Sequence, residues 1–324
     1  MNTSKSLLRM IALAAIALLL VAGVASAAGT WLTTPSGAII WNPEPQPNET
    51  ATWLGDKDTD NYATGYGVLR WFEDGKLTQT FQGTMVKGNP HGRGMYKWRD
   101  GTSYEGDFVN GHFSGKGVLD VPGAGLYRGD FADDKAAGKG IYRFTNGNYY
   151  EGDFVNDKPH GKGIYHWADG GIYEGDFIEG TRTGKGVFKF PDNGGSYVGD
   201  FKDGAFHGKG ILKTPQGETY EGDFADNSKN GKGVYTFADG RRYEGDFVND
   251  EFQGQGTFTW PNGDTYTGAF VKNLRTGKGI FKDADGTRYE GEFLNSFYHG
   301  QGTLYGPDGK ILKKGQWAEG KFIK

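Results

Sequence analysis

The sequence contains no cysteine, which excludes disulfide bonds, thiolate metal sites and a cysteine nucleophile. It also lacks an excess of positive charge, because its formal net charge at pH 7 is -4. A mildly acidic chain has no long-range attraction to nucleic acid, so we expect no nucleic-acid partner. After residue 28, no apolar run is long enough to span a bilayer. We therefore expect this part of the chain to be soluble or peripheral to a membrane.

The one long apolar run lies near the N-terminus. Lys5 and Arg9 precede a stretch from Met10 to Val24, and a small-x-small sequence ending at Ala27 follows it. This order is typical of a cleaved secretory signal peptide. The alternative is an uncleaved anchor, but the run is short for a span of about 20 residues. We predict a signal peptide over residues 1–27 and export to a periplasm or the extracellular space, where the protein could lie against a membrane.

Glycine is abundant, with 57 residues in 324, and it is periodic. A Tyr-x-Gly unit recurs every 23 residues, with a single step of 24. The tyrosines that open it are Tyr104, Tyr127, Tyr150, Tyr173, Tyr197, Tyr220, Tyr243, Tyr266 and Tyr289. Fixed self-similarity at this period indicates a stacked array, in which one unit cannot bury its apolar face alone.

Each unit has the pattern of a β-hairpin. Residues 150–154, Tyr-Glu-Gly-Asp-Phe, alternate with a period of two, and a second strand follows in segments such as 231–237. The Asp239-Gly240 dipeptide tolerates the positive φ of a tight turn. Glycine weakens a strand, so we expect the ring of Tyr150 or Phe154 to cover a glycine of an adjacent strand. The pattern leaves open which face carries Tyr165.

These units predict an all-β fold: an elongated, single-layer antiparallel sheet of repeated hairpins that is twisted or coiled. Ten units would extend on the order of 100 Å at ~4.8 Å per strand. The expected organisation is a signal peptide over 1–27, an extended segment over 28–52, a degenerate repeat over 53–80, ten repeats over 81–312 and a half repeat over 313–324.

The Tyr-Glu-Gly-Asp/Glu-Phe and Gly-Lys-Gly-Val/Ile-Tyr motifs at this step closely resemble the MORN (membrane occupation and recognition nexus) repeat. The resemblance covers nearly all of residues 81–312. It implies an elongated sheet of hairpins, which in junctophilins and plant phosphatidylinositol phosphate kinases is associated with membrane attachment, scaffolding or regulation of a joined domain. A chain of repeats behind a signal peptide resembles a bacterial envelope protein.

Basic residues of the Gly-Lys-Gly motif form a column that could meet lipid phosphates. Its members are Arg93, Lys116, Lys139, Lys162, Lys185, Lys209, Lys232 and Lys278. Parallel columns of glutamate and aspartate, which include Glu151 and Asp153, favour the other interpretation, a solvated ladder of cross-strand ion pairs.

The tyrosine column also has two interpretations. Rings repeated along a coiled sheet could stack against a glycan or an apolar peptide, or could form a dimer interface. The alternative is that the rings form the core, because a single-layer sheet has no second layer to bury them.

Candidate metal ligands are few. Asp56, Asp58 and Asp60 have the spacing that opens a calcium loop, but Asn61 and Gly67 stand where that loop needs Gly and Glu. A polar loop is the favoured interpretation. No kinase, nucleophile-elbow or zinc-protease motif is present, so we expect neither catalytic residues nor a cofactor.

The sequence therefore predicts a non-catalytic, exported scaffold that binds a protein partner or another copy of itself. The alternative is an envelope-binding module for anionic lipid headgroups or glycans. An enzyme is disfavoured because a repeat spreads equal residues along a line, whereas catalysis needs different residues at one point.

Overall fold

The computed structural model describes residues 29–324, so the predicted signal peptide lies outside the described residues. The chain divides into two compact units. The N-terminal unit comprises described residues up to 168 together with 176–181, and the C-terminal unit comprises 169–175 and 182–324. In residues 29–324, no helix has both the length and the apolar character that a membrane crossing requires.

Strands make up most of both units. Those of the N-terminal unit are β1 (Thr30–Thr33), β2 (Ile39–Asn42), β3 (Glu49–Lys57), β4 (Ala63–Glu73), β5 (Lys76–Val86), β6 (Asn89–Trp98), β7 (Ser103–Val109), β8 (His112–Val121), β9 (Gly125–Ala132), β10 (Lys135–Phe144), β11 (Tyr149–Val155) and β12 (Lys158–His166). Two strands contain residues of both units: β13 (Ile172–Ile178) and β14 (Thr181–Lys189).

A 3-10 turn, η2 (Pro191–Asn193), follows β14. The remaining strands of the C-terminal unit are β15 (Ser196–Lys202), β16 (Ala205–Lys213), β17 (Thr219–Ala225), β18 (Ser228–Thr236), β19 (Arg242–Val248), β20 (Glu251–Thr259), β21 (Thr265–Val271), β22 (Leu274–Lys282), β23 (Arg288–Leu294), β24 (Phe297–Tyr305), β25 (Ile311–Ala318) and β26 (Lys321–Phe322).

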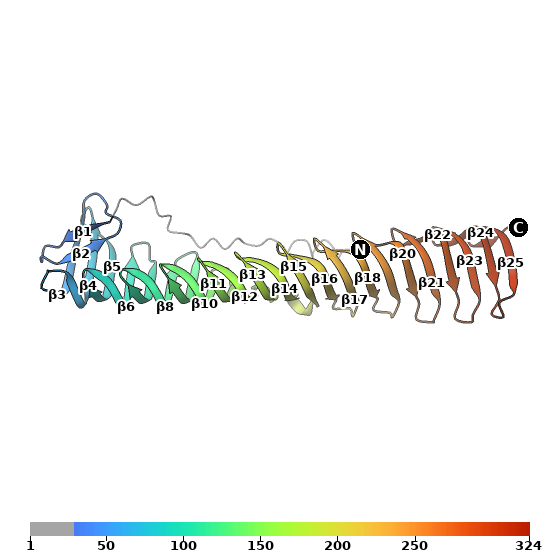
Figure 1. Ribbon diagram of the computed structural model, residues 1–324, viewed down its shortest axis with the longest axis horizontal. Coiled ribbons are helices and arrows are strands. Elements are labelled where there is room, and N and C mark those ends of the chain that lie inside the picture. Colours follow the sequence, from blue (N-terminus) through green and yellow to red (C-terminus); the bar gives the residue numbers. More distant parts are fainter. Residues whose placement is uncertain (1–28) are drawn as a thin grey trace. The chain divides into compact units, whose positions relative to one another are not determined.

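Consecutive strands pair in antiparallel fashion. In the N-terminal unit, β3 to β12 pair in chain order, and in the C-terminal unit β14 to β26 do the same. Within each unit the strands lie side by side in one twisted layer (Figure 1). The structure confirms the predicted all-β class and the antiparallel sheet of repeated hairpins.

Two kinds of turn alternate along the sheet. Asp239-Gly240 lies in the longer one, which the amide of Phe237 closes by donating to the carbonyl of Arg241 at 2.9 Å. The two-residue turn lies at the other end of the unit, where Asn249 and Asp250 have φ of 48° and 69°. Positive φ at both residues is the geometry of a type I′ turn, whose twist matches that of the strands.

The recurring glycines are required for different structural reasons. Gly161 has φ +66° beside the register shift that interrupts β11 and β12, so it serves a β-bulge. Gly163 has no room for a side chain, because a β-carbon there would overlap the ring of Tyr150. This contact confirms that a tyrosine ring covers a glycine of the adjacent strand. Tyr165 pairs with Tyr150 in register and is also buried, so the two rings share a face.

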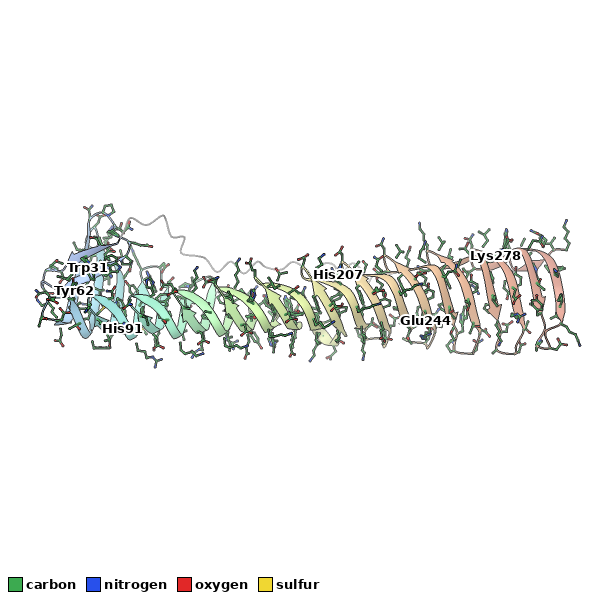
Figure 2. All side chains as sticks on the ribbon, viewed as in Figure 1. Trp31, Tyr62, His91, His207, Glu244 and Lys278 are labelled. Atoms are coloured by element: carbon green, nitrogen blue, oxygen red, sulfur yellow. The ribbon has the colours of Figure 1, made fainter. Side chains whose placement is uncertain are left out.

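Residues before β3 form a small sheet of two strands, β1 and β2. Trp31 on β1 lies against the ring of Tyr62, with centroids 4.9 Å apart (Figure 2). The amide of Trp41 on β2 donates to the carbonyl of Gly88 at 2.9 Å. The small sheet is thereby joined by rings and backbone hydrogen bonds to the first hairpins of the N-terminal unit.

Candidate interaction surface

The nine tyrosines of the column are core residues. Tyr150 is fully buried; Phe154 and Phe177 meet its ring edge-on at 5.1 and 5.0 Å, and its hydroxyl donates to the carbonyl of Asp153 at 3.0 Å. This burial corrects the interpretation of the column as a partner-binding surface and supports its alternative, the core. Exposure is at most 1% for every member: Tyr104, Tyr127, Tyr150, Tyr173, Tyr197, Tyr220, Tyr243, Tyr266 and Tyr289.

The side chain that lies on each tyrosine ring differs between repeats. Phe206 stacks on Tyr197 with centroids 3.8 Å apart, whereas the guanidinium of Arg275 lies 5.4 Å from the centroid of Tyr266. Burial raises the pKa of Tyr266 to about 12. The hydroxyl of Tyr266 donates to the carbonyl of Ala269 at 3.0 Å, so this phenol serves as a neutral, buried hydrogen-bond donor.

The lysines lie on the opposite, solvated face and form a ladder of ion pairs. Lys209 bonds Asp223 at 2.7 Å although its side chain is 72% exposed. The hydrogen bond from Lys185 lowers the pKa of Asp200 below its usual range. The predicted cross-strand pairing is therefore present, and each exposed pair contributes less than about 1 kcal/mol. Six of the eight members of the basic column form such an ion pair with an aspartate: Lys116, Lys139, Lys162, Lys185, Lys209 and Lys232.

Two members of the basic column differ. Arg93 and Lys278 make no ion pair with any described residue, although they face Asp107 and Glu292 in register. Lys278, like Glu244, projects from the sheet into solvent (Figure 2). The lipid-binding role of this column stays a prediction.

A second outward row runs beside the lysines, on the other side of the paired glycines. In the C-terminal unit it alternates aliphatic and acidic residues, because Ile211 pairs with Glu221, Glu221 with Val234 and Val234 with Glu244. Between the two rows is a groove of about 910 Å³, the C-terminal groove. Its lining includes Val198, Lys209, Ile211, Glu221, Lys232, Val234, Glu244, Gln255, Thr257 and Thr267, with glycines along the floor.

The N-terminal unit has a smaller groove at the corresponding register, the N-terminal groove, of about 480 Å³. Here Arg128 stands at the position that Glu105 and Glu221 hold in their own repeats. The lining consists of Arg93, Glu105, Lys116, Gly117, Val118, Arg128, Gly129 and Lys139. Four cations and one carboxylate make this lining more basic than that of the C-terminal groove.

The candidate calcium ligands Asp56, Asp58 and Asp60 belong to the first hairpin. One carboxylate oxygen of Asp58 accepts hydrogen bonds from the amides of Asp60 at 3.0 Å and Tyr62 at 2.8 Å, so it shapes the turn. Among residues 29–324, no three histidine, aspartate or glutamate side chains gather closely enough to hold a metal ion.

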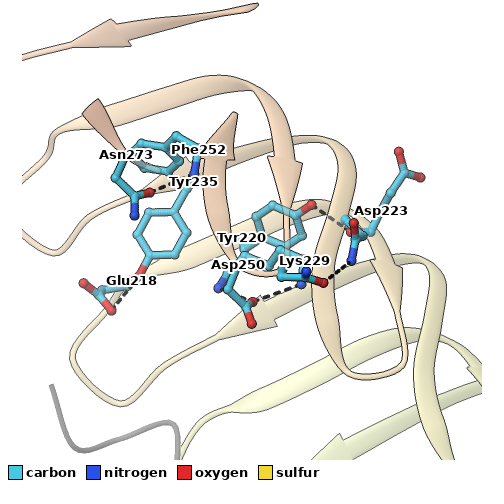
Figure 3. A network of polar contacts seen from close by, with 10 residues as sticks. Glu218, Tyr220, Asp223, Lys229, Tyr235, Asp250, Phe252 and Asn273 are labelled. Atoms are coloured by element: carbon cyan, nitrogen blue, oxygen red, sulfur yellow. Dashed lines mark hydrogen bonds and ion pairs between the residues drawn. The ribbon is translucent and has the colours of Figure 1, made fainter. Parts of the chain in front are cut away.

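A contact that the sequence interpretation missed joins the two-residue turns that carry Asp, Asn or Ser at their second position to the preceding hairpin. Asp250 accepts a hydrogen bond from the amide of Lys229 at 3.0 Å and returns one from its own amide to the carbonyl of Lys229 at 3.1 Å. Asn273 does the same with Phe252 (Figure 3). The recurrence of Asp, Asn or Ser at this place in the repeat was the available signal. The bonds fasten successive hairpins without using the outward rows.

Comparison with known families identifies the MORN repeat in this chain. The model of the MORN repeat matches ten segments, at residues 81–103, 104–120, 127–149, 150–172, 173–195, 197–219, 220–241, 243–265, 266–288 and 289–311. Together they cover more than half of the chain. No curated protein matches.

Solved structures with similar backbones are distant. The TCP10 domain of Danio rerio CPAP, in complex with a peptide of Danio rerio STIL, is 13% identical; the match covers 74% of this chain and 100% of that one, with a TM-score of 0.37. The SAS-4 (dCPAP) TCP domain of Drosophila melanogaster, in complex with a proline-rich motif of Ana2, is 14% identical over 53% and 86%, with a TM-score of 0.31. Scores this low carry no argument about function.

Proposed function

Because this chain belongs to the MORN repeat family, we propose that it is a non-catalytic, exported scaffold that holds a protein partner along its sheet. The support comes from how its recurring residues are used. The tyrosines are buried, and six of the eight column cations are paired with aspartate. The recurring tyrosines and lysines therefore stabilise the sheet, and the grooves between the two outward rows are the surfaces that could bind a partner.

The C-terminal groove is the observation that carries the proposal. Its lining residues come from consecutive strands β15 to β21, which at ~4.8 Å per strand gives a length of about 29 Å. The backbone of the paired glycines forms its floor, and Ile211 and Val234 provide aliphatic contacts beside charged ones. A mixed apolar and polar lining of this length suits a segment of polypeptide. The segment can come from another protein or from a second copy of this chain.

The predicted signal peptide supports the proposed export, and the arrangement of the side chains supports a non-catalytic role. Catalysis needs a nucleophile, an acid or base and a charge-stabilising group converging within hydrogen-bond distance. Here like residues recur from hairpin to hairpin, and the tyrosine hydroxyls bond backbone carbonyls. Fractionation of cells that express the full gene, followed by N-terminal sequencing, tests export: an intact N-terminus in the cytosol would refute it.

Blocking the groove tests the scaffold. The double change Ile211→Arg and Val234→Arg places two long cations in the C-terminal groove, and Val248→Arg, an exposed position outside it, is the matched control. We expect proteins captured by the wild type and by the control to be lost from the double variant, and a purified captured protein to show at least a tenfold weaker Kd in calorimetry, which is about 1.4 kcal/mol. Equal affinity for all three forms, with unchanged circular dichroism, would refute the groove as the binding surface.

A further inference from the structure

The N-terminal groove contains two arginines that take no part in the ladder of ion pairs. Its other cations are committed: Lys116 bonds Asp130 at 2.5 Å and Lys139 bonds Asp153 at 2.7 Å. Arg93 and Arg128 are exposed, and neither forms an ion pair within residues 29–324. Two unpaired guanidinium groups thus line one groove.

Arg128 is a departure from the repeat. The tyrosine before it is followed by glutamate in most other units, as at Glu105, Glu151 and Glu221. Nothing in the fold requires the arginine, because its neighbours in register, Val118 and Ile141, are the same kinds of residue that flank glutamate elsewhere. The exchange leaves the hairpin intact and reverses the charge of the groove at that point.

We propose that the N-terminal groove binds an acidic, extended segment of a polypeptide. This proposal rests on the proposed scaffold function and names the partner chemistry for one groove. Guanidinium groups match carboxylates in a bidentate geometry, and Val118 between them offers an apolar contact. The register also suits a strand-like ligand: Arg93 on β6 and Arg128 on β9 are three strands apart and offset by two residues along the strand, which gives a diagonal separation of about 16 Å.

At about 3.3 Å per residue, residues four apart in an extended chain point to the same side and lie about 13 Å from each other, and the long arginine side chains can cover the remaining ~3 Å. Carboxylates at positions i and i+4 of the segment would therefore meet the two arginines. A membrane is the weaker fit, because a hollow of about 480 Å³ is recessed from a flat bilayer and the chain has a formal net charge of -4.

Fluorescence anisotropy with the purified full chain tests the proposal. The probes are a labelled peptide of alternating glutamate and valine, the same peptide with lysine for glutamate, inorganic phosphate as competitor, and vesicles of phosphatidylcholine with phosphatidylserine. We expect the glutamate peptide alone to bind, with an affinity that falls as salt rises. Arg128→Glu, which introduces the residue that most other repeats carry, should weaken the binding of the glutamate peptide at least about tenfold, and adding Arg93→Glu should abolish it.

The matched control is Lys162→Glu with Lys278→Glu, at two exposed cations of the basic column that line neither groove, which should change the Kd of the glutamate peptide less than about twofold. The proposal is overturned if the glutamate peptide does not bind, if it binds the Arg93→Glu/Arg128→Glu variant equally, or if vesicles or phosphate alone bind in an arginine-dependent manner. The scaffold proposal is judged separately, because its test uses the C-terminal groove: partner loss in the Ile211/Val234 variant would leave it standing even where the acidic peptide fails.

Discussion

The first hairpin of the large sheet and the regular repeats perform the same packing with different rings. In the repeat that begins at Tyr220, the ring covers Gly233, and the hydroxyl donates to the carbonyl of Asp223 at 2.8 Å. In the first hairpin, Trp53 covers Gly67, and its indole N–H donates to the carbonyl of Asp56 at 2.8 Å. Each donor reaches a carbonyl three residues further along the chain. A tryptophan in a degenerate repeat thus reproduces both the cover and the hydrogen bond.

Phe81, at the start of the next unit, covers glycine in the same way but cannot form the hydrogen bond. It is fully buried, and a β-carbon on Gly83 or Gly94 would overlap its ring, but it has no polar atom to donate. The three cases share the ring over paired glycines and differ in the hydrogen bond at its tip. Cover of the glycine backbone is therefore the main requirement of the fold, and the hydrogen bond is an addition to it.

The largest effect that distinguishes the two regions should appear at alkaline pH. Burial raises the pKa of both Tyr266 and Tyr289 to about 12, whereas Trp53 and Phe81 have no such proton. A raised phenol pKa means that the folded state holds the proton more tightly, so this stability is complete below the unfolded pKa of about 10 and is lost as pH rises through about 12.

We expect tyrosinate absorbance at 295 nm from the column to rise together with loss of the far-ultraviolet circular dichroism signal as pH rises through about 12. Tyr266→Phe removes one of these phenol protons, so it is the control that assigns the absorbance change to the tyrosine column. Full ionisation of all tyrosines by about pH 11 with an unchanged circular dichroism spectrum would contradict the burial of the column.

Removal of a ring should give the next largest effect, and it should be similar in both regions. Tyr220→Ala and Trp53→Ala each leave a cavity over glycine and should lower the free energy of unfolding by about 4 kcal/mol. Urea denaturation measures the loss, and hydrogen exchange should place it at β17 and β18 for the first variant and at β3 and β4 for the second. Leu54→Ala, at a side chain that is 69% exposed, should stay within about 0.5 kcal/mol. A cost near that of the control for either ring would show that its cover is dispensable.

The sequence predicts those features of the structure in which a residue contacts other residues of its own hairpin. The strand period, the turn residues and the cover of Gly163 by Tyr150 are local and follow from the pattern. The bonds from Asp250 to the preceding hairpin and the grooves depend on the pairing of neighbouring hairpins, which the pattern of one unit does not contain. The burial of the tyrosine column stayed ambiguous for the same reason, since the rings are closed over by the next hairpin.

Adding a side chain beneath a ring should have an intermediate effect that depends on that ring. Gly233→Ala places a β-carbon against Tyr220 and should cost about 2 kcal/mol by overpacking. In the Tyr220→Ala background the same change meets a cavity, so its cost should fall to well under 1 kcal/mol. A double-mutant cycle by urea denaturation measures this coupling. Additive costs would mean that Gly233 is required by its backbone rather than by the ring.

The smallest effect should come from the hydrogen bond at the tip of the ring. Tyr220→Phe keeps the cover and removes only the bond to Asp223, so it should cost about 1 kcal/mol. Phe81→Tyr adds a hydroxyl where the other repeats carry one and should stabilise the chain by up to about 1 kcal/mol if the hydroxyl reaches the carbonyl of Thr84, three residues on. Both changes are measurable by urea denaturation. An equal cost for Tyr220→Phe and Tyr220→Ala would contradict this order. It would mean that the hydrogen bond, and not the covering ring, is the contribution that Tyr220 shares with Trp53. The presence of Phe81, which has no hydroxyl, would then need a different explanation.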